Sequence, residues 1–263
     1  MPESTGRLSY CTTCKNRLWQ LRDTLPDNLR RVSEDGNSEI VLVNYNSDDE
    51  LDTWVRQFQP HIDDGTLRYL HQRTEPHFHA SKAKNLAHLA ATGSHLINLD
   101  ADNYIGDTVP TWRTQWEARP DLLIHGFSPD ESRPQRSTEE AARLRPDSST
   151  GTYGRIGLPR TRFLALGGYD EQLLPSAHED QDLMDRAEAA GLPIIRHPQS
   201  GRAAIRNSHR ETMRHSGIPL EWWDARNLNK QRSAENLHLG RLIANPGRPP
   251  VKVLLNFSEE TAF

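Results

Sequence analysis

The sequence predicts an α/β fold with a mostly parallel central sheet flanked by helices. Short runs of β-branched and aliphatic residues alternate with longer stretches whose apolar residues recur every three or four positions, which is the pattern of strand and helix in a parallel sheet. Three of the short runs end abruptly in polar residues. The length of 263 residues suits one large domain of this class, or such a domain with a C-terminal extension.

The predicted strands are short and apolar. The first two, at residues 8–11 and 40–43, are followed by strands at 67–70 and 95–99. A last strand is predicted at 251–257. The first four are expected to be parallel, because a helical stretch separates each strand from the next.

Amphipathic stretches between the strands predict the helices. Residues 18–25 and 51–58 carry apolar side chains at spacings of three and four. A third helix is predicted between Ser81, its N-cap, and Gly93, its C-terminal stop. Residues 175–191 predict a further helix that begins after a proline and stops at a glycine.

Polar residues gather where three predicted strands end. They occupy residues 12–17, 44–49 and 100–103. Ligands of open α/β sheets bind beyond the carboxyl ends of strands, where the connecting loops meet, so these segments are expected to border one crevice. The segment 128–152 is rich in serine, proline and charge, which indicates a loop that could serve as a lid or contact an acceptor.

Composition and charge exclude some classes of function. The formal net charge is −4, which argues against strong non-specific binding of nucleic acid. No apolar run approaches the roughly 18–20 residues of a membrane span. The first ten residues lack the basic and apolar pattern of a signal peptide, so a cytoplasmic location is expected.

Two further patterns leave alternatives open. Four arginines recur every fourth residue and would line a helix either as a solvated face or as a contact for a diphosphate or an acidic acceptor: Arg202, Arg206, Arg210 and Arg214.

Cys11 and Cys14 form a C-x-x-C pair, but a structural zinc site needs four ligands and no nearby histidine pair completes it. A redox dithiol is the alternative, and two reduced cysteines in a strand-to-helix loop are favoured.

A D-x-D pair, Asp100 and Asp102, ends the strand predicted at 95–99. Carboxylate oxygens are hard ligands that suit Mg²⁺ or Mn²⁺, and the diphosphate of a bound nucleotide would complete the coordination shell. Such an ion neutralises a leaving nucleoside diphosphate. Acidic pairs at strand ends also solvate loops, so the pair alone does not decide the function.

Three carboxylates in four residues mark the start of the helix predicted after the proline: Glu179, Asp180 and Asp182. Ser176 and Glu179 fit the S-x-x-E capping box, which gives Glu179 a structural role. Asp180 lacks that alternative. It is therefore favoured as the general base that deprotonates an acceptor hydroxyl, with Glu179 as its rival.

Six short motifs resemble those of family-2 glycosyltransferases and the related galactosyltransferase C-terminal region. They are T-x-K-N-R at 13–17, I-V-L-V-N-Y-N-S-D-D at 40–49, S-K-A-K-N-L at 81–86, L-I-N-L-D-A-D-N at 96–103, L-G-G-Y-D-E at 166–171 and H-E-D-Q-D-L at 178–183. The resemblance covers residues 8–200 and rests on the order and spacing of the motifs. It implies a GT-A fold and a hexosyltransferase of EC class 2.4, which is metal-dependent and inverting.

The resemblance also implies the site residues. The nucleotide sugar, a UDP-sugar by preference, would contact residues from four of the motifs: Thr12, Thr13, Cys14, Asn16, Arg17, Asn44, Asn46, Lys84, Asn85, Asp100 and Ala101. Asp102 and Asp100 would hold Mn²⁺ or Mg²⁺, with His209, His215 or Asn207 as the third ligand. The sugar and acceptor would lie against three further residues: Gly168, which leaves room for the sugar, Tyr169 and Arg155. Asp180 would be the catalytic base.

Three positions depart from the family pattern. The family usually has an aspartate in place of Asn44, where it pairs with the imino proton of the base, so the preference for uracil is open. Thr12 replaces the usual proline and Cys14 the usual tyrosine. The acceptor is undetermined, because acceptor contacts come from variable loops.

The predicted organisation is a catalytic domain at 1–200, with a nucleotide-binding half at 1–103 and an acceptor half at 104–200. Residues 201–263 would form an extension packed on that domain.

A nucleotidyltransferase would need a glycine-rich phosphate loop after the first strand, and the segment T-T-C-K-N-R contains no glycine. A non-catalytic nucleotide-sugar-binding module and a retaining transferase are the remaining alternatives.

Overall fold

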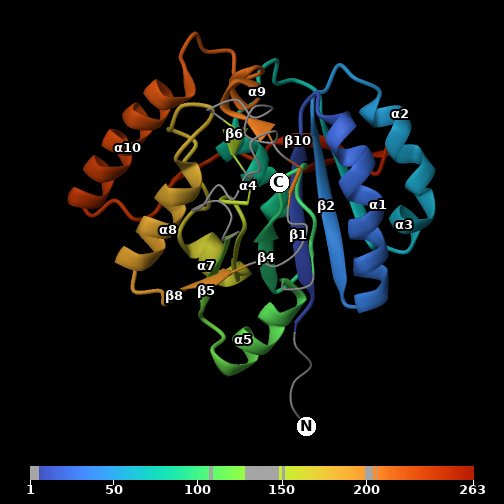
Figure 1. Ribbon diagram of the computed structural model, residues 1–263, viewed down its shortest axis with the longest axis horizontal. Helices are drawn as coiled ribbons and strands as arrows, with labels where there is room; N and C mark the ends of the chain where they lie inside the picture. Colours follow the sequence, from blue (N-terminus) through green and yellow to red (C-terminus); the bar gives the residue numbers. More distant parts are fainter. Residues whose placement is uncertain (1–5, 107–108, 128–147, 150–151, 199–203, 206) are drawn as a thin grey trace, which may run out of the picture.

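The computed structural model describes residues 6–106, 109–127, 148–149, 152–198, 204–205 and 207–263 (Figure 1). Two predictions from sequence lie largely outside these residues. They are the loop at 128–152, of which 128–147 and 150–151 are not described, and the arginine stripe, in which Arg202 and Arg206 are not described.

A nine-stranded sheet forms the centre of the described structure, in the order β11-β10-β3-β2-β1-β4-β7-β5-β8. The strands are β1 (Leu8–Cys14), β2 (Ser38–Tyr45), β3 (Leu67–Gln72), β4 (His95–Asn98), β5 (Leu123–Phe127), β7 (Ile156–Pro159), β8 (Ile194–Pro198), β10 (Lys252–Leu255) and β11 (Glu259–Ala262). The four central strands β3, β2, β1 and β4 are parallel, as predicted. β7 runs antiparallel to both β4 and β5, and β10 runs antiparallel to β3, so the sheet is mixed.

Helices cover both faces of this sheet. They are α1 (Leu18–Asp35), α2 (Leu51–Val55), η1 (Arg56–Phe58), α3 (Gln59–Asp63), α4 (Ala80–Ala90), η2 (Val109–Thr111), α5 (Trp112–Ala118), α7 (Arg160–Ala165), α8 (Glu179–Ala189), α9 (His209–Met213) and α10 (Trp222–His238). A small second sheet pairs β6 (Ser148–Ser149) with β9 (Asn207–Ser208). In this described part of the chain, no helix is long and apolar enough to cross a membrane.

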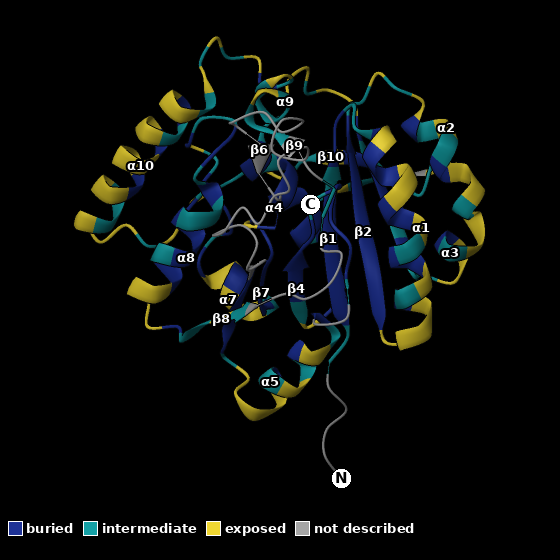
Figure 2. Ribbon diagram, viewed as in Figure 1, coloured by how far each residue is buried: buried dark blue, intermediate teal, exposed yellow. Residues whose placement is uncertain are grey.

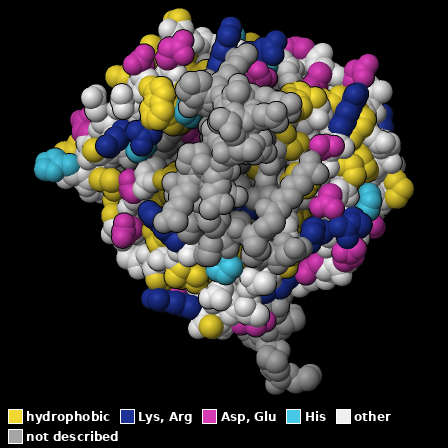
Figure 3. Space-filling view, in the orientation of Figure 1, with side chains coloured by type: hydrophobic (Ala, Val, Ile, Leu, Met, Phe, Trp, Pro, Cys, Tyr) yellow, Lys and Arg dark blue, Asp and Glu magenta, His cyan; other side chains and the backbone are white. Residues whose placement is uncertain are grey.

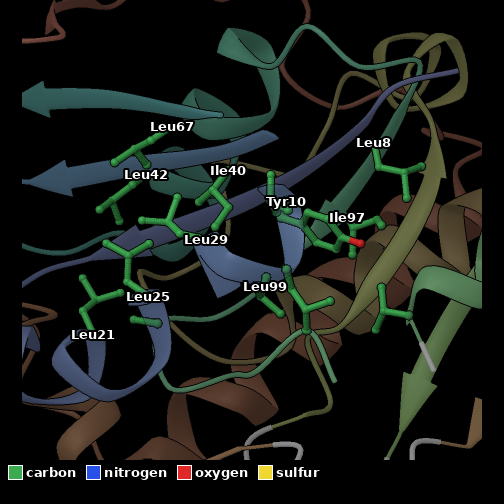
Figure 4. Packing of buried hydrophobic residues seen from close by; sticks show 14 of the residues in the cluster. Leu8, Tyr10, Leu21, Leu25, Leu29, Ile40, Leu42, Leu67, Ile97 and Leu99 are labelled. Carbon is green, nitrogen blue, oxygen red and sulfur yellow. The ribbon is translucent and has the colours of Figure 1, made fainter. Parts of the chain in front are cut away.

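Alternation along the strands creates two cores. On β2, Ile40 and Leu42 pack in the core under α1, whereas Val41 and Val43 pack in the core under α4. Successive side chains of a strand point to opposite faces, which is why a continuous apolar run fills both layers. Figure 2 shows the central strands buried along their length, and Figure 4 shows the leucines of α1 against those of β2 and β3.

Both predicted ends of α4 were wrong, and so was the helical stripe of arginines. α4 begins at Ala80 with His79 as its N-cap, so Ser81 lies inside the helix. The helix ends at Ala90, before Gly93. A Cβ on Gly93 would lie 2.5 Å from the Arg7 carbonyl oxygen, so this glycine permits close packing against the chain before β1 and does not cap the helix. The described residues 204–205 and 207–208 are not helical, so the arginines at 202–214 do not lie on one continuous helix.

The predicted last strand is a hairpin. β10 pairs with β3 and then turns back as β11, with Asn256 and Phe257 at positive φ in the turn. The Asn256 side chain and backbone bond the backbone of Tyr69 in β3. Residues from the predicted extension therefore complete one edge of the sheet, and α10 packs beside α8 (Figure 1).

Candidate active site

The loops after β1 and β2 are bound to each other. The backbone N–H of Asn16 donates to Ser47 Oγ at 3.0 Å, and the Asp48 N–H donates to Asn16 Oδ1 at 2.6 Å. Lys15 Nζ donates to the carbonyl oxygens of Tyr45 and Asn46. Two of the three polar strand ends predicted from the sequence thus form one continuous rim.

Asn44 is buried at the end of β2, and both ends of its amide are used within the protein. Its Oδ1 accepts from the Ser47 N–H at 2.9 Å, and its Nδ2 donates to the Tyr69 hydroxyl at 2.8 Å. Tyr69 in turn donates to Asp52 Oδ1 at 3.0 Å. The side chain therefore shapes the β2 loop, and its contact with a nucleobase stays a prediction.

The D-x-D pair lies just after β4. Asn98 Nδ2 donates to Asp100 Oδ1 at 3.1 Å, and Asn103 Nδ2 donates to Asp102 Oδ1 at 2.7 Å. Burial and the charge of Asp100 raise the pKa of Asp102 to about 6, although Arg17 opposes the rise. Two close carboxylates with one raised pKa form a site where a bound cation would be stabilised.

Arg17 connects this pair with the C-terminal part of the chain. Its charge lowers the pKa of Asp102, and its Nη2 donates to the Glu211 carbonyl oxygen at 3.1 Å. The loop after β1, the end of β4 and α9 therefore meet around one guanidinium.

The predicted base lies in a buried ionic cluster at the start of α8. Lys84 Nζ on α4 is 2.6 Å from Asp180 Oδ1 and 2.9 Å from Glu179 Oε1. Burial raises the pKa of Asp180, Lys84 opposes the rise, and Glu179 and Asp100 add to it, so that the pKa reaches about 7. Burial also acts to raise the pKa of Glu179, but Lys84 outweighs it and the pKa is lowered.

The predicted capping box is wrong. His178, in the left-handed conformation, is the N-cap of α8, and no side chain caps the helix. Glu179 faces Lys84 instead of the helix end. A long-range ion pair has replaced the local hydrogen bond that the spacing of Ser176 and Glu179 suggested, so capping does not distinguish Glu179 from Asp180.

Gly154 lies between the two carboxylate groups. A Cβ at this position would be 2.8 Å from Asp100 Oδ2 and 2.9 Å from Asp180 Oδ2. The end of β4 and the start of α8 thus bring their carboxylates to the same point, which a side chain at residue 154 would obstruct. No pattern in the sequence marks Gly154 as functional, since its role depends on two segments far from it in the chain.

Asn85 and Gly168 contact each other. Asn85 Oδ1 accepts from the Tyr169 N–H at 2.8 Å, and its Nδ2 donates to the Tyr169 carbonyl oxygen at 2.8 Å. Gly168 has φ +75°, and a Cβ there would lie 2.3 Å from Asn85 Oδ1. The space beside Gly168 is therefore filled by Asn85. Tyr169 is buried, with Lys84 Nζ 5.2 Å from its ring centroid.

The remaining predicted substrate residue, Arg155, is buried beneath the D-x-D turn. Its Nη2 donates to Asn103 Oδ1 at 2.8 Å and to the Tyr104 carbonyl oxygen at 3.0 Å. Thr12 and Cys14 are buried in β1, and the Ala101 carbonyl oxygen accepts from Thr24 Oγ1 at 2.7 Å. These side chains support the loops of the site from below.

The candidate third metal ligands lie apart from each other. The His209 ring stacks on Trp222 with 3.9 Å between ring centroids, whereas His215 Nδ1 is 3.4 Å from Asn16 Nδ2 beside the β1 loop. Among the described residues, no group of three or more histidine, cysteine or acidic side chains is arranged to hold a metal ion. The D-x-D carboxylates are thus a two-residue set, and a third protein ligand stays a prediction.

The sequence predicts the two cysteines in a strand-to-helix loop. In the structure both lie within β1. Cys11 packs in the core under α4 and Cys14 in the core under α1. Because they face opposite sides of the sheet, they cannot share a metal or close a disulfide. Burial raises the pKa of both thiols, that of Cys14 to about 12.

We expect a Cys11→Ala, Cys14→Ser double variant to keep its activity. Neither thiol is positioned as a nucleophile. The expected cost to stability is about 1 kcal/mol for the small cavity left by Cys11→Ala, plus the burial of a hydroxyl in Cys14→Ser. Nucleotide-sugar turnover in the presence and absence of dithiothreitol would check this. Loss of turnover in a variant with a native circular dichroism spectrum would contradict it.

Comparison with known proteins assigns the first part of the chain. Residues 9–116 match the family described as Glycosyl transferase family 2. The matched residues are similar to that family and make up less than half of the chain. The match includes the β1 and β2 loops, Lys84 and the D-x-D pair, and it supports the predicted glycosyltransferase class. The match ends at residue 116, early in the acceptor half predicted at 104–200, so a galactosyltransferase-like C-terminal region is not shown.

Solved structures of glycosyltransferases share the fold. A mannosyltransferase from Pyrobaculum calidifontis, in complex with GDP-Man and Mn²⁺, is 19% identical with a TM-score of 0.53, over 75% of this chain and 56% of that one. S. aureus TarS 1–349 with UDP is 17% identical with a TM-score of 0.56, over 88% and 70%. GalNAc-T7 with UDP, GalNAc and Mn²⁺ is 16% identical with a TM-score of 0.55, over 73% and 42%. No curated protein sequence matches the chain.

These likenesses establish the predicted GT-A fold. The chain spans 56% of the length of the mannosyltransferase and 42% of that of GalNAc-T7.

Around the rim of the face in Figure 3, basic and acidic side chains of the described residues are interspersed, in keeping with the net charge of −4.

Proposed function

We propose that the chain is a metal-dependent, inverting glycosyltransferase that moves a sugar from a nucleotide-diphosphate sugar to an acceptor hydroxyl. The observation that carries this proposal is the meeting of Asp100 and Asp180 at Gly154. Asp100 follows β4, within the residues that match glycosyl transferase family 2. Asp180 lies in the first turn of α8, outside that match. Transfer needs one group for the leaving diphosphate and one for the attacking hydroxyl, and the two carboxylates supply both.

The D-x-D residues fit a divalent cation on their chemistry. Two oxygen ligands from Asp100 and Asp102 suit Mg²⁺ or Mn²⁺, which accept water and phosphate oxygens at the other positions. The raised pKa of Asp102 supports this assignment, because it reflects a carboxylate that lacks full compensation by Arg17. When bound, the cation would neutralise charge on the departing nucleoside diphosphate. The complexes of the mannosyltransferase and GalNAc-T7 contain Mn²⁺.

The rim formed by the β1 and β2 loops would bind the nucleoside. Asn16 and Asn46 adopt positive φ there, which is typical of tight turns. Two of the structures compared above bind UDP and one binds GDP-Man, so uridine and guanosine donors are both candidates. A UDP-sugar remains the preferred donor, with Asn44 in place of the usual aspartate.

Asp180 would act as the general base. Its Oδ1 is bound to Lys84, which leaves Oδ2, on the side of Gly154, to accept the proton of the acceptor hydroxyl. The acceptor oxygen then bonds to the anomeric carbon as the bond from that carbon to the diphosphate oxygen breaks. Attack opposite the leaving group inverts the anomeric configuration. Lys84 favours the ionised form of the base and holds it in place.

The pH dependence of turnover should follow Asp180. Its pKa is raised to about 7, so the base is protonated below that pH, and kcat/KM is expected to rise with pH through neutrality. Lys84 lowers this pKa, and Lys84→Met is therefore expected to move the acidic limb to higher pH and to reduce thermal stability. Rates measured between pH 5 and pH 9 would check both effects, and an unmoved limb in Lys84→Met would contradict the assignment.

Donor binding gives an independent test of the proposed function. A ligand that binds the folded state raises the melting temperature by mass action. We expect at least one of UDP-GlcNAc and GDP-mannose to do so more strongly with Mn²⁺ than with EDTA. Asp102→Ala should remove the difference between Mn²⁺ and EDTA. Equal shifts with Mn²⁺ and with EDTA would argue against a metal-dependent site.

A further inference from the structure

The turn before α8 is held in an unfavourable backbone conformation. Ala177 has φ +76° and His178 has φ +73°, and they directly precede Glu179 and Asp180. Residues with a side chain rarely adopt this left-handed region, and two in succession need contacts from elsewhere in the protein to hold them. Neither residue is glycine, so the local sequence alone does not account for this turn.

One side chain from α10 bonds to this turn. Asn229 is buried, and its Nδ2 donates to the carbonyl oxygens of Ala177 at 2.7 Å, Ser176 at 3.2 Å and Leu174 at 3.3 Å. Its Oδ1 accepts from the Leu174 N–H at 2.7 Å. A single amide thus bonds both ends of the segment 174–177, although more than 50 residues separate it from them in the chain.

We infer that Asn229 is a positioning residue for Asp180: by bonding both ends of the segment 174–177, which leads into the left-handed residues 177 and 178, it fixes the first turn of α8 against Lys84. This inference rests on the proposed function, because its effect is measured through Asp180. Asp180 Oδ1 must stay 2.6 Å from Lys84 Nζ while Oδ2 stays beside Gly154. A shift of the helix start would disturb both contacts.

Ser233 provides a matched control on the same helix. It lies one turn after Asn229 and is buried to the same degree, 1% exposed in each case. Among the described residues, its hydroxyl has no hydrogen-bond partner. Ser233→Ala therefore perturbs the packing of α10 without touching the segment 174–177.

The test compares Asn229→Ala and Asn229→Asp with Ser233→Ala and the wild type. Asn229→Asp keeps the shape and the acceptor for Leu174 but removes both N–H donors. Hydrolysis of UDP-GlcNAc and GDP-mannose with Mn²⁺ is measured, so that water takes the place of the acceptor. We expect kcat to fall by about 10- to 100-fold in both Asn229 variants with little change in donor KM, the scale of a misplaced catalytic group. Ser233→Ala should keep the wild-type kcat.

A second substitution tests the cause of the effect. Glycine adopts positive φ without strain, so Ala177→Gly in the Asn229→Ala background should restore part of the lost kcat. Hydrogen exchange of the α8 first-turn amides should be faster in Asn229→Ala and unchanged in Ser233→Ala. Exchange is measured without turnover, so it reports on the turn independently of the reaction.

The outcomes separate this inference from the function on which it rests. An Asn229→Ala protein that exchanges faster but keeps the wild-type kcat would overturn the positioning role alone. Equal losses of kcat and of donor affinity, or no rescue by Ala177→Gly, would also overturn it, since they indicate general destabilisation. A folded wild type that neither binds nor hydrolyses a nucleotide sugar would overturn the proposed function itself.

Discussion

An Asp180→Asn variant should turn over roughly 10²–10⁴ times more slowly than the wild type, which is the usual contribution of a positioned general base. Asparagine keeps the size of the side chain, and its oxygen can still accept the hydrogen bond from Lys84 Nζ, now 2.6 Å from Asp180 Oδ1. The variant loses the basicity that removes the acceptor proton. Donor affinity should change little, and steady-state kinetics with varied donor would measure both quantities.

Glu179→Gln is the matched control for this variant. Glu179 and Asp180 share the same lysine, but Glu179 Oε1 bonds Lys84 while Asp180 Oδ2 lies at Gly154 beside Asp100. We expect Glu179→Gln to reduce turnover less than Asp180→Asn. Near-full turnover in Asp180→Asn would remove it as the base. Product NMR that shows the anomeric configuration of the donor retained would contradict the inverting mechanism.

Asp102→Ala is expected to abolish transfer. Asp102 lies just after β4, and its loss leaves Asp100 as the single carboxylate of the D-x-D pair. EDTA should inhibit the wild type, and Mn²⁺ or Mg²⁺ should restore it, whereas neither ion should restore the variant. Activity assays with each ion would check this, and full activity of the wild type in EDTA would contradict it.

The same variant should not be less stable at neutral pH. The pKa of Asp102 is raised from 3.8 to about 6 in the folded state, mainly by burial. Below the unfolded-state pKa the carboxyl group is protonated in both states, so its burial as an ion costs no stability. As the pH rises through the folded-state pKa the buried group ionises, and the folded state loses stability. At pH 7.5 the ionised side chain therefore disfavours the folded state, and its removal should leave the melting temperature unchanged or higher. Asp63→Ala, an exposed carboxylate on α3, is the control.

Much of the nucleotide-binding half could be predicted from the sequence because its signals are local. The run at 40–43 is long and β-branched enough to identify β2, and the polar residues after it mark the strand end. Parallel strands bring such ends to one edge, so the approach of the β1 and β2 loops followed from topology alone. The antiparallel direction of β7 and β10 could not be predicted, because it depends on pairing with distant residues.

The details of the site depended on contacts that no spacing rule reveals. The spacing of Ser176 and Glu179 predicts a capping role for Glu179, but Lys84 on α4 binds it instead. Gly154 is recognised as part of the site only because Asp100 and Asp180 approach it from different elements. Asn229 acts on residues more than 50 positions away. Sequence reasoning thus found the carboxylates, while the groups that orient them needed three-dimensional packing.

If the proposed function is correct, this site breaks the bond between the anomeric carbon and the diphosphate of a nucleotide sugar. Release of nucleoside diphosphate from UDP-GlcNAc and GDP-mannose with Mn²⁺ measures that step directly, for the wild type, Asp102→Ala and Asp180→Asn. We predict steady release by the wild type from at least one donor, none above background from Asp102→Ala, and slow release from Asp180→Asn. Equal release by all three folded proteins, or release that EDTA leaves unchanged, would contradict the account.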